Sequence, residues 1–321
     1  MLDGSGFWVV VLPYPRRDGA ATPPVLARFA TVEAARRPSP PPNGQAAWAG
    51  VGGPWTSSLD ADAYRDRVIA IRSSIEAGDV YQVNLGRLLS APLAHPSSAS
   101  AWALGSVLAD RHPAPNAAVV DLPSADLYVA SASPELFLRR DGDRLSSRPI
   151  KGTAAAGEPF LPKDRAENVM IVDLVRNDLG RVCVYGSVSV PGLCVEEAHP
   201  GLHHLVSTVE GRLAPGMGWV DLLAATFPPG SVTGAPKLAA VDAIASLEPV
   251  DRGPYCGAIG WVDADRRIGE LNVAIRTFWL ADERLWFGTG GGITWDSTPD
   301  GEWNETEVKA SRLLAVASSV T

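Results

Sequence analysis

Four acidic side chains occur as two pairs with the same spacing. Asp164 and Glu167 stand three residues apart, and Glu302 and Glu305 repeat that spacing. Residues three apart in a helix share a face, so each pair would present two carboxylates in one direction. Such oxygen donors, with no His or Cys beside them, suit an octahedral magnesium ion that keeps some of its water. The same spacing is typical of a solvated helix face or a helix N-terminus, so the pairs alone leave both interpretations open.

Two glycine-rich segments look like phosphate-binding loops but lack the spacing. Residues 229–237 (PGSVTGAPK) end in a lysine, whereas a Walker A loop needs four residues between its glycines and then Gly-Lys-Ser/Thr. Residues 288–293 (GTGGGI) miss the dinucleotide-binding spacing and open no helix after a βα turn. We expect both to be loops in which missing side chains let the backbone approach a ligand.

The elements that must position these residues are a mixture of helices and strands. Apolar residues at helical spacing predict a helix between Asp60, which suits an N-cap, and Gly78, which suits a helix end. Further helices are predicted near 164–179, 218–226, 235–247 and 303–318. Strands are predicted at 7–12, 80–85, 127–130, 136–139, 182–190, 258–262, 274–280 and 285–288. Because helices and strands do not alternate strictly, we expect an α+β fold with large antiparallel sheets and no Rossmann layout.

The N-terminal part is expected to be a strand and a linker attached to a larger domain. Residues 36–53 are rich in Pro, Gly and Ala and carry no period, which indicates a loop. The strand at 7–12 has too little chain around it to be stable alone, so it must pair with the main body. We therefore divide the chain into an N-terminal strand and linker (1–53) and a catalytic domain (54–321).

Composition narrows the kinds of partner. The chain has 321 residues, 46% of them hydrophobic, and can bury a large core. A formal charge of −8 without a clustered basic run argues against a nucleic-acid or membrane partner and favours a small molecule. The apolar stretch at 7–12 is too short to span a bilayer and lacks a basic leader, so we expect a cytoplasmic protein. The three widely spaced cysteines, at 183, 194 and 256, indicate buried free thiols.

Nine segments in order resemble the chorismate-utilising enzymes, a family that includes anthranilate synthase component I, aminodeoxychorismate synthase component I, isochorismate synthase and salicylate synthase. The resemblance covers about residues 60–315 and implies a sandwich of two large antiparallel sheets with outer helices, with chorismate as substrate. The segments are YQVNL (81–85), ASPE (132–135), PIKGT (149–153), ENVMIVDLVRNDLGRV (167–182), HLVSTVEG (204–211), FPPGSVTGAPK (227–237), YCGAIGWV (255–262), NVAIRT (272–277) and GGGITWDSTPDGEWNETEVKA (290–310).

The resemblance assigns roles to the acidic pairs. Glu167 and Glu305 would ligate magnesium directly, with Asp164 and Glu302 assisting. The ion would clamp the ring carboxylate of chorismate and stabilise charge as the ring hydroxyl departs.

The resemblance also implies a substrate pocket. Arg276 and Tyr255 would hold the enolpyruvyl carboxylate, a task that suits the two-donor fork of arginine. Lys309 either binds a substrate carboxylate or forms a structural salt bridge with Glu305, four residues earlier. His204 is either catalytic or a hydrogen-bonded core histidine. Backbone and hydroxyl contacts would come from Gly152, Thr153, Gly290, Gly291 and Gly292.

Three positions bear on the reaction type. Glu135, in ASPE, matches the family's general acid, which must be protonated to help the hydroxyl leave. Gln82 stands at the position that, in the water-adding members (isochorismate and salicylate synthases), resembles a lysine acting as a base toward water. Because an amide has no basic lone pair, water addition is disfavoured. Lys151, in PIKGT, replaces the alanine typical of anthranilate synthases, and a pocket beside a cation favours loss of its proton and nucleophilic attack.

The chain therefore most resembles aminodeoxychorismate synthase component I. In such enzymes the lysine adds to ring carbon 2 and expels the hydroxyl from carbon 4, and ammonia then enters at carbon 4 as the lysine leaves. We expect 4-amino-4-deoxychorismate for p-aminobenzoate and folate, with ammonia from a glutamine amidotransferase subunit or from solution. Alternatives are a carboxylate-binding role for Lys151, an anthranilate synthase component I, and a non-catalytic chorismate-binding subunit.

Three features depart from the family pattern. GTAAAG (152–157) lacks the arginines that usually follow PIKGT, and Asn168 replaces the histidine common after the metal-ligating glutamate. Residues 1–60 are shorter than the usual N-terminal region and contain no recognisable tryptophan-binding element. We therefore expect no feedback inhibition by tryptophan, and docking of an amidotransferase is in doubt.

Overall fold

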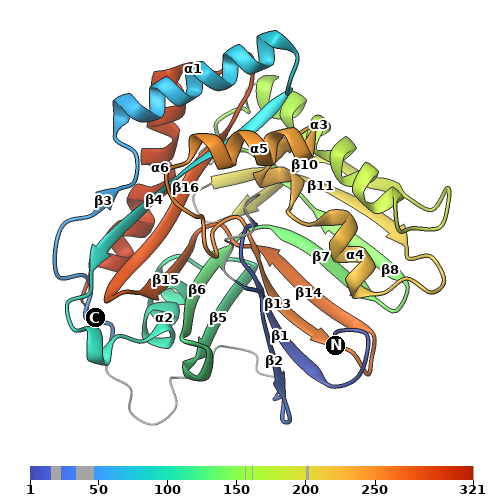
Figure 1. Cartoon of the computed structure of the whole chain (residues 1–321), viewed down its shortest axis with the longest axis horizontal. Helices are drawn as coiled ribbons and strands as arrows, with labels where there is room; N and C mark the ends of the chain where they lie inside the picture. The colour runs from blue at the N-terminus through green and yellow to red at the C-terminus, as the bar shows by residue number, and fades with distance from the viewer. Residues whose placement is uncertain (16–22, 34–46, 156, 161, 200–201, 321) are drawn as a thin grey trace.

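A computed structural model describes residues 1–15, 23–33, 47–155, 157–160, 162–199 and 202–320. In this part of the chain, strands form two antiparallel sheets, and helices lie outside them (Figure 1). The larger sheet has the order β10-β11-β8-β7-β14-β13-β1-β2, with β9 also paired to β11. The smaller sheet has the order β12-β4-β16-β15-β6-β5, with β3 paired to β4. The α+β sandwich that the sequence predicts is confirmed.

The larger sheet consists of β1 (Phe7–Leu12), β2 (Val25–Phe29), β7 (Leu136–Asp141), β8 (Arg144–Arg148), β9 (Ile150–Ala155), β10 (Ser189–His199), β11 (Leu202–Arg212), β13 (Ala258–Asp263) and β14 (Ile268–Val273). The smaller sheet consists of β3 (Thr56–Ser57), β4 (Gln82–Pro92), β5 (Asn116–Leu122), β6 (Leu127–Ser133), β12 (Gly234–Ala235), β15 (Thr277–Ala281) and β16 (Arg284–Ile293).

Six α-helices occur in the described residues: α1 (Ala61–Ala77), α2 (Ala101–Arg111), α3 (Pro162–Gly180), α4 (Trp219–Thr226), α5 (Lys237–Leu247) and α6 (Pro299–Ser318). Short 3₁₀ turns lie at Pro96–Ser98, Pro123–Ala125 and Gly230–Val232. Helices α1, α2 and α6 contact the smaller sheet, whereas α3 contacts β9, β10 and β11 of the larger one. Each sheet therefore has its own helical cover, and α5 contacts β4 and β12 (Figure 1).

Several predicted elements are confirmed together with the local chemistry behind them. Asp60 accepts a hydrogen bond from the Ala63 amide at 2.8 Å, and Gly78 ends α1 with φ of 84°. These are the N-cap and the left-handed helix end that the sequence predicts. The four other predicted helices appear as α3, α4, α5 and α6, the last beginning four residues earlier than expected. The strand at 7–12 pairs with β13, so the N-terminal strand does belong to the main body.

Other expectations were wrong. Of the strand predicted at 182–190, only its last two residues belong to β10, because the chain turns at Gly186, whose φ is 76°. The strand predicted from residue 274 begins at Thr277, after Arg276 with φ of 52°. The GTGGGI segment lies inside β16 and is not a loop. Helix α2, the long strand β11 and the shorter strands β2, β3, β5, β8, β9, β12 and β14 were not predicted.

The remaining N-terminal and composition-based expectations have mixed outcomes. Residues 34–46, most of the predicted linker, lie outside the described part, and residues 47–53 form no helix or strand. Cys183 and Cys256 are buried free thiols, whereas Cys194 is half-buried. No helix in the described residues is long and apolar enough to cross a membrane.

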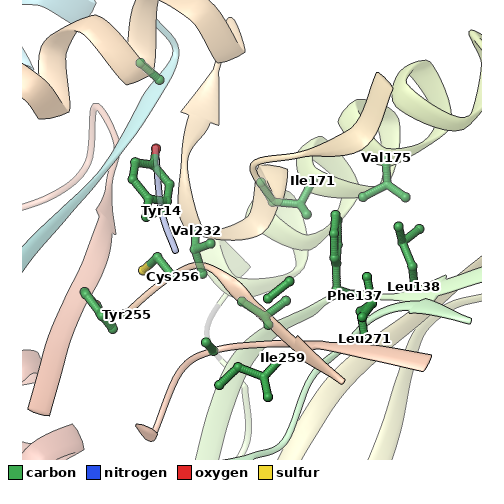
Figure 2. Close-up of a cluster of buried hydrophobic side chains, with 14 of the residues drawn as sticks. Tyr14, Phe137, Leu138, Ile171, Val175, Val232, Tyr255, Cys256, Ile259 and Leu271 are labelled. Carbon is green, nitrogen blue, oxygen red and sulfur yellow. The ribbon is translucent and has the colours of Figure 1, made fainter. Parts of the chain in front are cut away.

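The main hydrophobic core joins α3 to the larger sheet. Figure 2 shows Ile171 and Val175 of α3 above Phe137 and Leu138 of β7, with Leu271 of β14 close by. These side chains are at most 9% exposed. Burial of this apolar surface holds α3 on the sheet, so the acidic residues at its first turns keep a fixed position beside β9.

Candidate active site

Lys151 and Glu167 form the centre of the candidate site. The Lys151 Nζ on β9 donates to Glu167 Oε1 on α3 at 3.0 Å, and their side chains are 11% and 18% exposed. Gln82 Nε2, at the start of β4, donates to the same Oε1 at 2.5 Å. A residue of the larger sheet, Lys151, and a residue of the smaller sheet, Gln82, therefore both donate to one carboxylate oxygen of Glu167 on α3.

The protonation of Lys151 differs from the expectation. Burial by itself lowers the pKa of this amine, but the charge and hydrogen bond of Glu167, with the charges of Glu135 and Glu305, raise it overall. The expected loss of the proton followed from the pocket and a nearby cation, whereas in the structure the Glu167 carboxylate binds the amine directly. In this arrangement Lys151 is an ammonium ion.

Glu135 is a buried acid with the properties of a proton donor. It lies between β6 and β7, is 3% exposed, and accepts a hydrogen bond from the Ser231 hydroxyl at 2.5 Å. Burial raises its pKa to about 7, although the Ser231 hydrogen bond and the charge of Lys151 act in the opposite direction. Near neutral pH a large fraction of this carboxyl is protonated, as general-acid catalysis requires.

Arg276 lies close enough to Glu135 for their charges to interact. It immediately precedes β15 with φ of 52°, an uncommon conformation for a residue with a side chain. Burial lowers the pKa of its guanidinium, and the Glu135 carboxylate partly offsets that effect. A partly desolvated guanidinium beside the general acid suits an anionic group of a ligand.

The second acidic pair lies on α6. Glu302 is 4% exposed; its Oε1 accepts from the Ser297 hydroxyl at 2.7 Å, while its buried Oε2 has no hydrogen-bond partner among the described residues. Glu305 Oε1 lies 2.7 Å from Lys309 Nζ, which also donates to the Gly290 carbonyl at 3.0 Å. The structure therefore shows the salt bridge between Lys309 and Glu305, and contact of Lys309 with a substrate carboxylate stays a prediction.

These carboxylates partly fit a metal ion. A Cβ added at Gly291 would lie 3.0 Å from Glu302 Oε2 and 3.4 Å from Glu305 Oε1, so both carboxylates face the space that this glycine leaves open. An unpaired buried oxygen and a second carboxylate facing the same space are suitable donors for a hard cation. In the described residues, however, no group of three or more His, Cys, Asp or Glu side chains is arranged to hold a metal. Glu167 instead binds Lys151 and Gln82.

The glycines of β16 allow side chains to lie directly on the strand. A Cβ at Gly292 would come within 2.0 Å of Gln82 Nε2 and 2.5 Å of Glu167 Oε1. A Cβ added at Gly288 would lie 2.1 Å from the ring of Tyr255. A Cβ added at Gly290 would lie 2.9 Å from the hydroxyl of the same tyrosine. The glycines of this segment are therefore approached closely by protein side chains, while the predicted approach of a ligand to their backbone stays a prediction. Tyr255 packs on these glycines and is 3% exposed.

The remaining predicted residues lie on neighbouring elements. Gly152 adopts φ of 84°, and a Cβ there would lie 2.8 Å from the Cβ of Asp164, so β9 and the first turn of α3 touch at this point. Thr153 of β9 lies opposite His204 of β11, which is 1% exposed. His204 therefore lies on β11, which is paired with β9, the strand that carries Lys151. A catalytic role for His204 stays a prediction.

Some relevant residues were not found from the sequence. Ser231 and Lys237 lie in PGSVTGAPK, for which the sequence predicted a close-approach loop and no role for either side chain. The Ser231 hydroxyl donates to Glu135, and the Lys237 amine pairs with Asp178 at 2.6 Å. Asn168, the unusual residue after Glu167, donates to the Leu205 carbonyl at 3.0 Å and fastens α3 to β11. The available signal was a polar residue within an apolar segment, which indicates a buried polar partner.

Comparison with known proteins identifies the class. A family model described as chorismate binding enzyme matches residues 25–315, and the chain belongs to this family. It is 41% identical over 271 residues to anthranilate synthase component 1 1 of Haloarcula marismortui, covering 80% of this chain and 54% of that protein. It is 38% identical over 276 residues to aminodeoxychorismate synthase component 1 of Escherichia coli K12, covering 81% and 58%.

Solved structures agree with this assignment. Anthranilate synthase component I from Streptococcus pneumoniae TIGR4 superimposes with a TM-score of 0.74 at 30% identity, over 87% of this chain and 63% of that one. The present chain spans a little over half the length of the two curated relatives described above. The family and the fold are therefore shown, while the two curated relatives described above carry different names, anthranilate synthase and aminodeoxychorismate synthase.

Proposed function

We propose that this protein aminates chorismate to 4-amino-4-deoxychorismate, as aminodeoxychorismate synthase component I does. The observation that carries the proposal is the position of Lys151, whose amine lies 3.0 Å from Glu167 and close enough to Glu135 for their charges to interact. A lysine held there is the nucleophile that this reaction needs, and an enzyme that adds ammonia directly has no use for one.

The steps follow from the placed residues. Glu167 accepts a proton from Lys151, the neutral amine attacks ring carbon 2, and Glu135 gives its proton to the hydroxyl leaving carbon 4, which departs as water. Ammonia, supplied by a glutaminase subunit or by solution, then bonds to carbon 4 as the bond from carbon 2 to Lys151 breaks. Gln82 has no basic nitrogen with which to activate water in place of ammonia.

The remaining residues bind and orient the substrate. Arg276 and the backbone of the β16 glycines are proposed to hold the enolpyruvyl carboxylate. The side chain of Tyr255 packs against Gly288 and Gly290 and would keep this strand in position. Glu302 and Glu305, with Glu167 and Asp164, are proposed to hold magnesium. When bound, this ion would neutralise the ring carboxylate and stabilise developing negative charge.

A second candidate is anthranilate synthase component I. It is favoured by the 41% identity to the Haloarcula marismortui protein. In that case Lys151 would only neutralise a carboxylate of the substrate. A non-catalytic chorismate-binding protein is less well supported, because Glu135 has both the burial and the raised pKa of a working acid.

The deciding experiment is trapping of the covalent intermediate. Protein is incubated with chorismate and MgCl₂ without any nitrogen donor, and its peptides are analysed by mass spectrometry. We expect the mass of chorismate less one water on the peptide containing Lys151, and none on the peptide containing Lys309. With ammonium chloride added, the product should be 4-amino-4-deoxychorismate; fluorescent anthranilate and an unmodified Lys151 would establish the second candidate instead.

A further inference from the structure

A small cavity adjoins Glu135 between β7, α3 and the Gly230–Val232 turn. Its volume is about 10 Å³, roughly what one buried water molecule needs. Part of its wall is apolar, and Figure 2 shows Val175 of α3 facing Phe137 and Leu138 of β7 there. Its polar wall is formed by Glu135, Ser147, Asp178, Thr226 and Ser231. The proposed general acid and a second carboxyl thus line one cavity.

Asp178 connects this cavity with a buried ion pair. Its Oδ2 lies 2.6 Å from Lys237 Nζ, which also donates to the Thr226 carbonyl at 2.8 Å. The side chains of Asp178 and Lys237 are 9% and 15% exposed, so the pair reaches solvent, whereas Glu135 is 3% exposed. A proton that enters from solvent at the pair therefore has polar groups to follow toward Glu135.

The pKa values of Glu135 and Asp178 are close enough for a proton to pass between the two carboxyls. Burial raises the pKa of Asp178 to about 6, although Lys237 and Arg181 lower it, and burial lowers the pKa of Lys237. On the Glu135 side, the nearby charges are those of Lys151 and Arg276, and the pKa is about 7. The two carboxyls therefore differ little in proton affinity, so a proton can move between them without a large energy cost.

We propose that a water molecule in this cavity links Glu135 to the Asp178–Lys237 pair and returns a proton to Glu135 in every turnover. Once Glu135 has given its proton to the departing hydroxyl, its carboxylate takes one from the cavity water. That water takes one from the pair, and the pair takes one from solvent. An ammonium ion that enters the reaction as ammonia releases one proton to solvent, so the cycle balances. Asp178 and Lys237 act through Glu135 and are positioning residues.

This inference rests on the proposed role of Glu135 as general acid and holds for either amination product. Its test uses Val175→Ile, which adds a methyl group to the cavity wall and leaves both carboxyls in place. The matched control is Val172→Ile, the same change on the same helix at a buried residue that does not line the cavity. Asp178→Asn is the second variant, with Asp178→Glu as the conservative rescue.

We expect Val175→Ile and Asp178→Asn to lower kcat about tenfold and to increase the solvent deuterium isotope effect on kcat, with the KM for chorismate changed less than about twofold. Val172→Ile should match the wild type, and Asp178→Glu should recover most of the rate. Unchanged kcat and isotope effect in Val175→Ile would overturn the relay even if Asp178→Asn fails to fold.

A structural measurement separates this inference from the proposed function. A high-resolution crystal structure of the wild-type protein should show a water molecule within hydrogen-bond distance of both Glu135 and Asp178. A cavity without water overturns the relay whatever reaction the enzyme performs. If the water is present but chorismate is not converted, the proposed function fails and the hydrogen-bonded link remains.

Discussion

The Lys151 amine and the Glu167 carboxylate lie 3.0 Å apart on β9 and α3, and this contact joins the two parts of the proposed chemistry. The same carboxylate is a proposed magnesium ligand and the group that holds the proposed nucleophile in its charged form. Lys151 can attack only after Glu167 or another acceptor has taken its proton. Ligand binding at Glu167 and activation of Lys151 are therefore coupled by geometry.

Removal of the Lys151 amine should abolish product formation. Lys151→Met keeps much of the side-chain length and removes the nucleophile, so we expect a loss of at least about 10³-fold in kcat for amination. The measurement is chromatographic quantification of product with ammonium chloride as nitrogen donor, alongside thermal unfolding to confirm the fold. A variant that retains more than a tenth of the wild-type rate would contradict a covalent role.

The reaction should depend on pH through Glu135. Because the acid must be protonated and its pKa in the ligand-free protein is about 7, kcat/KM for chorismate should be highest below that pH and fall as the pH rises through it. Initial rates between pH 5.5 and 9, at constant ionic strength and a fixed concentration of free ammonia, test this, with Glu135→Gln as the inactive reference. A rate that increases steadily up to pH 9 would speak against Glu135 as the acid.

Burial of Glu135 should also make stability depend on pH. Its pKa in the folded state, about 7, exceeds the ordinary glutamate value of 4.5. The native state therefore binds more protons than the unfolded state between these pH values, and stability falls as the pH rises through them. The penalty, fully present above about pH 7, is on the order of 3 kcal/mol. Glu135→Gln should therefore raise the free energy of unfolding relative to wild type more at pH 8 than at pH 5. Urea unfolding at both pH values measures this difference, and equal effects would contradict it.

Addition of one methyl group at Gly292 should disrupt the site while leaving the fold. The new Cβ would meet Gln82 Nε2 at 2.0 Å and Glu167 Oε1 at 2.5 Å, so both side chains must move. We expect Gly292→Ala to lower kcat/KM about 100-fold with a modest loss of stability. The control is Gly180→Ala at the end of α3, where an added Cβ meets nothing within 4 Å. Similar activity in the two variants would show that the contact is unimportant.

Magnesium dependence tests the acidic pairs. EDTA should abolish turnover, MgCl₂ should restore it, and Glu302→Gln should raise the magnesium concentration needed for half-maximal rate by about tenfold. The control is Asp173→Asn, a change at an exposed carboxylate on α3 that forms an ion pair with Arg176. Full activity of wild type in EDTA would exclude the proposed metal. Isothermal titration calorimetry with MgCl₂ alone provides a readout independent of activity.

Local signals predicted the elements that they control. Asp60 and Gly78 mark the ends of α1 because capping depends on residues within one turn. The strand at Phe7–Leu12 was found from its composition, whereas β14 and α2 were missed. Two predicted strands are interrupted at Arg276 and Gly186, whose φ values are positive. The types of the neighbouring residues do not indicate these backbone conformations.

The sequence alone determined the family, the acid Glu135, the amine Lys151 and the amide Gln82, because residue type at a motif position sets the available chemistry. Tertiary structure decided which groups meet. It paired Lys151 with Glu167 and so reversed the expected shift in its pKa. It also placed Ser231 and Asp178 beside one cavity at Glu135. Periodicity fixes the face on which a side chain lies, but its partner on another element depends on how sheets and helices pack, and proton affinity follows from that partner and from burial.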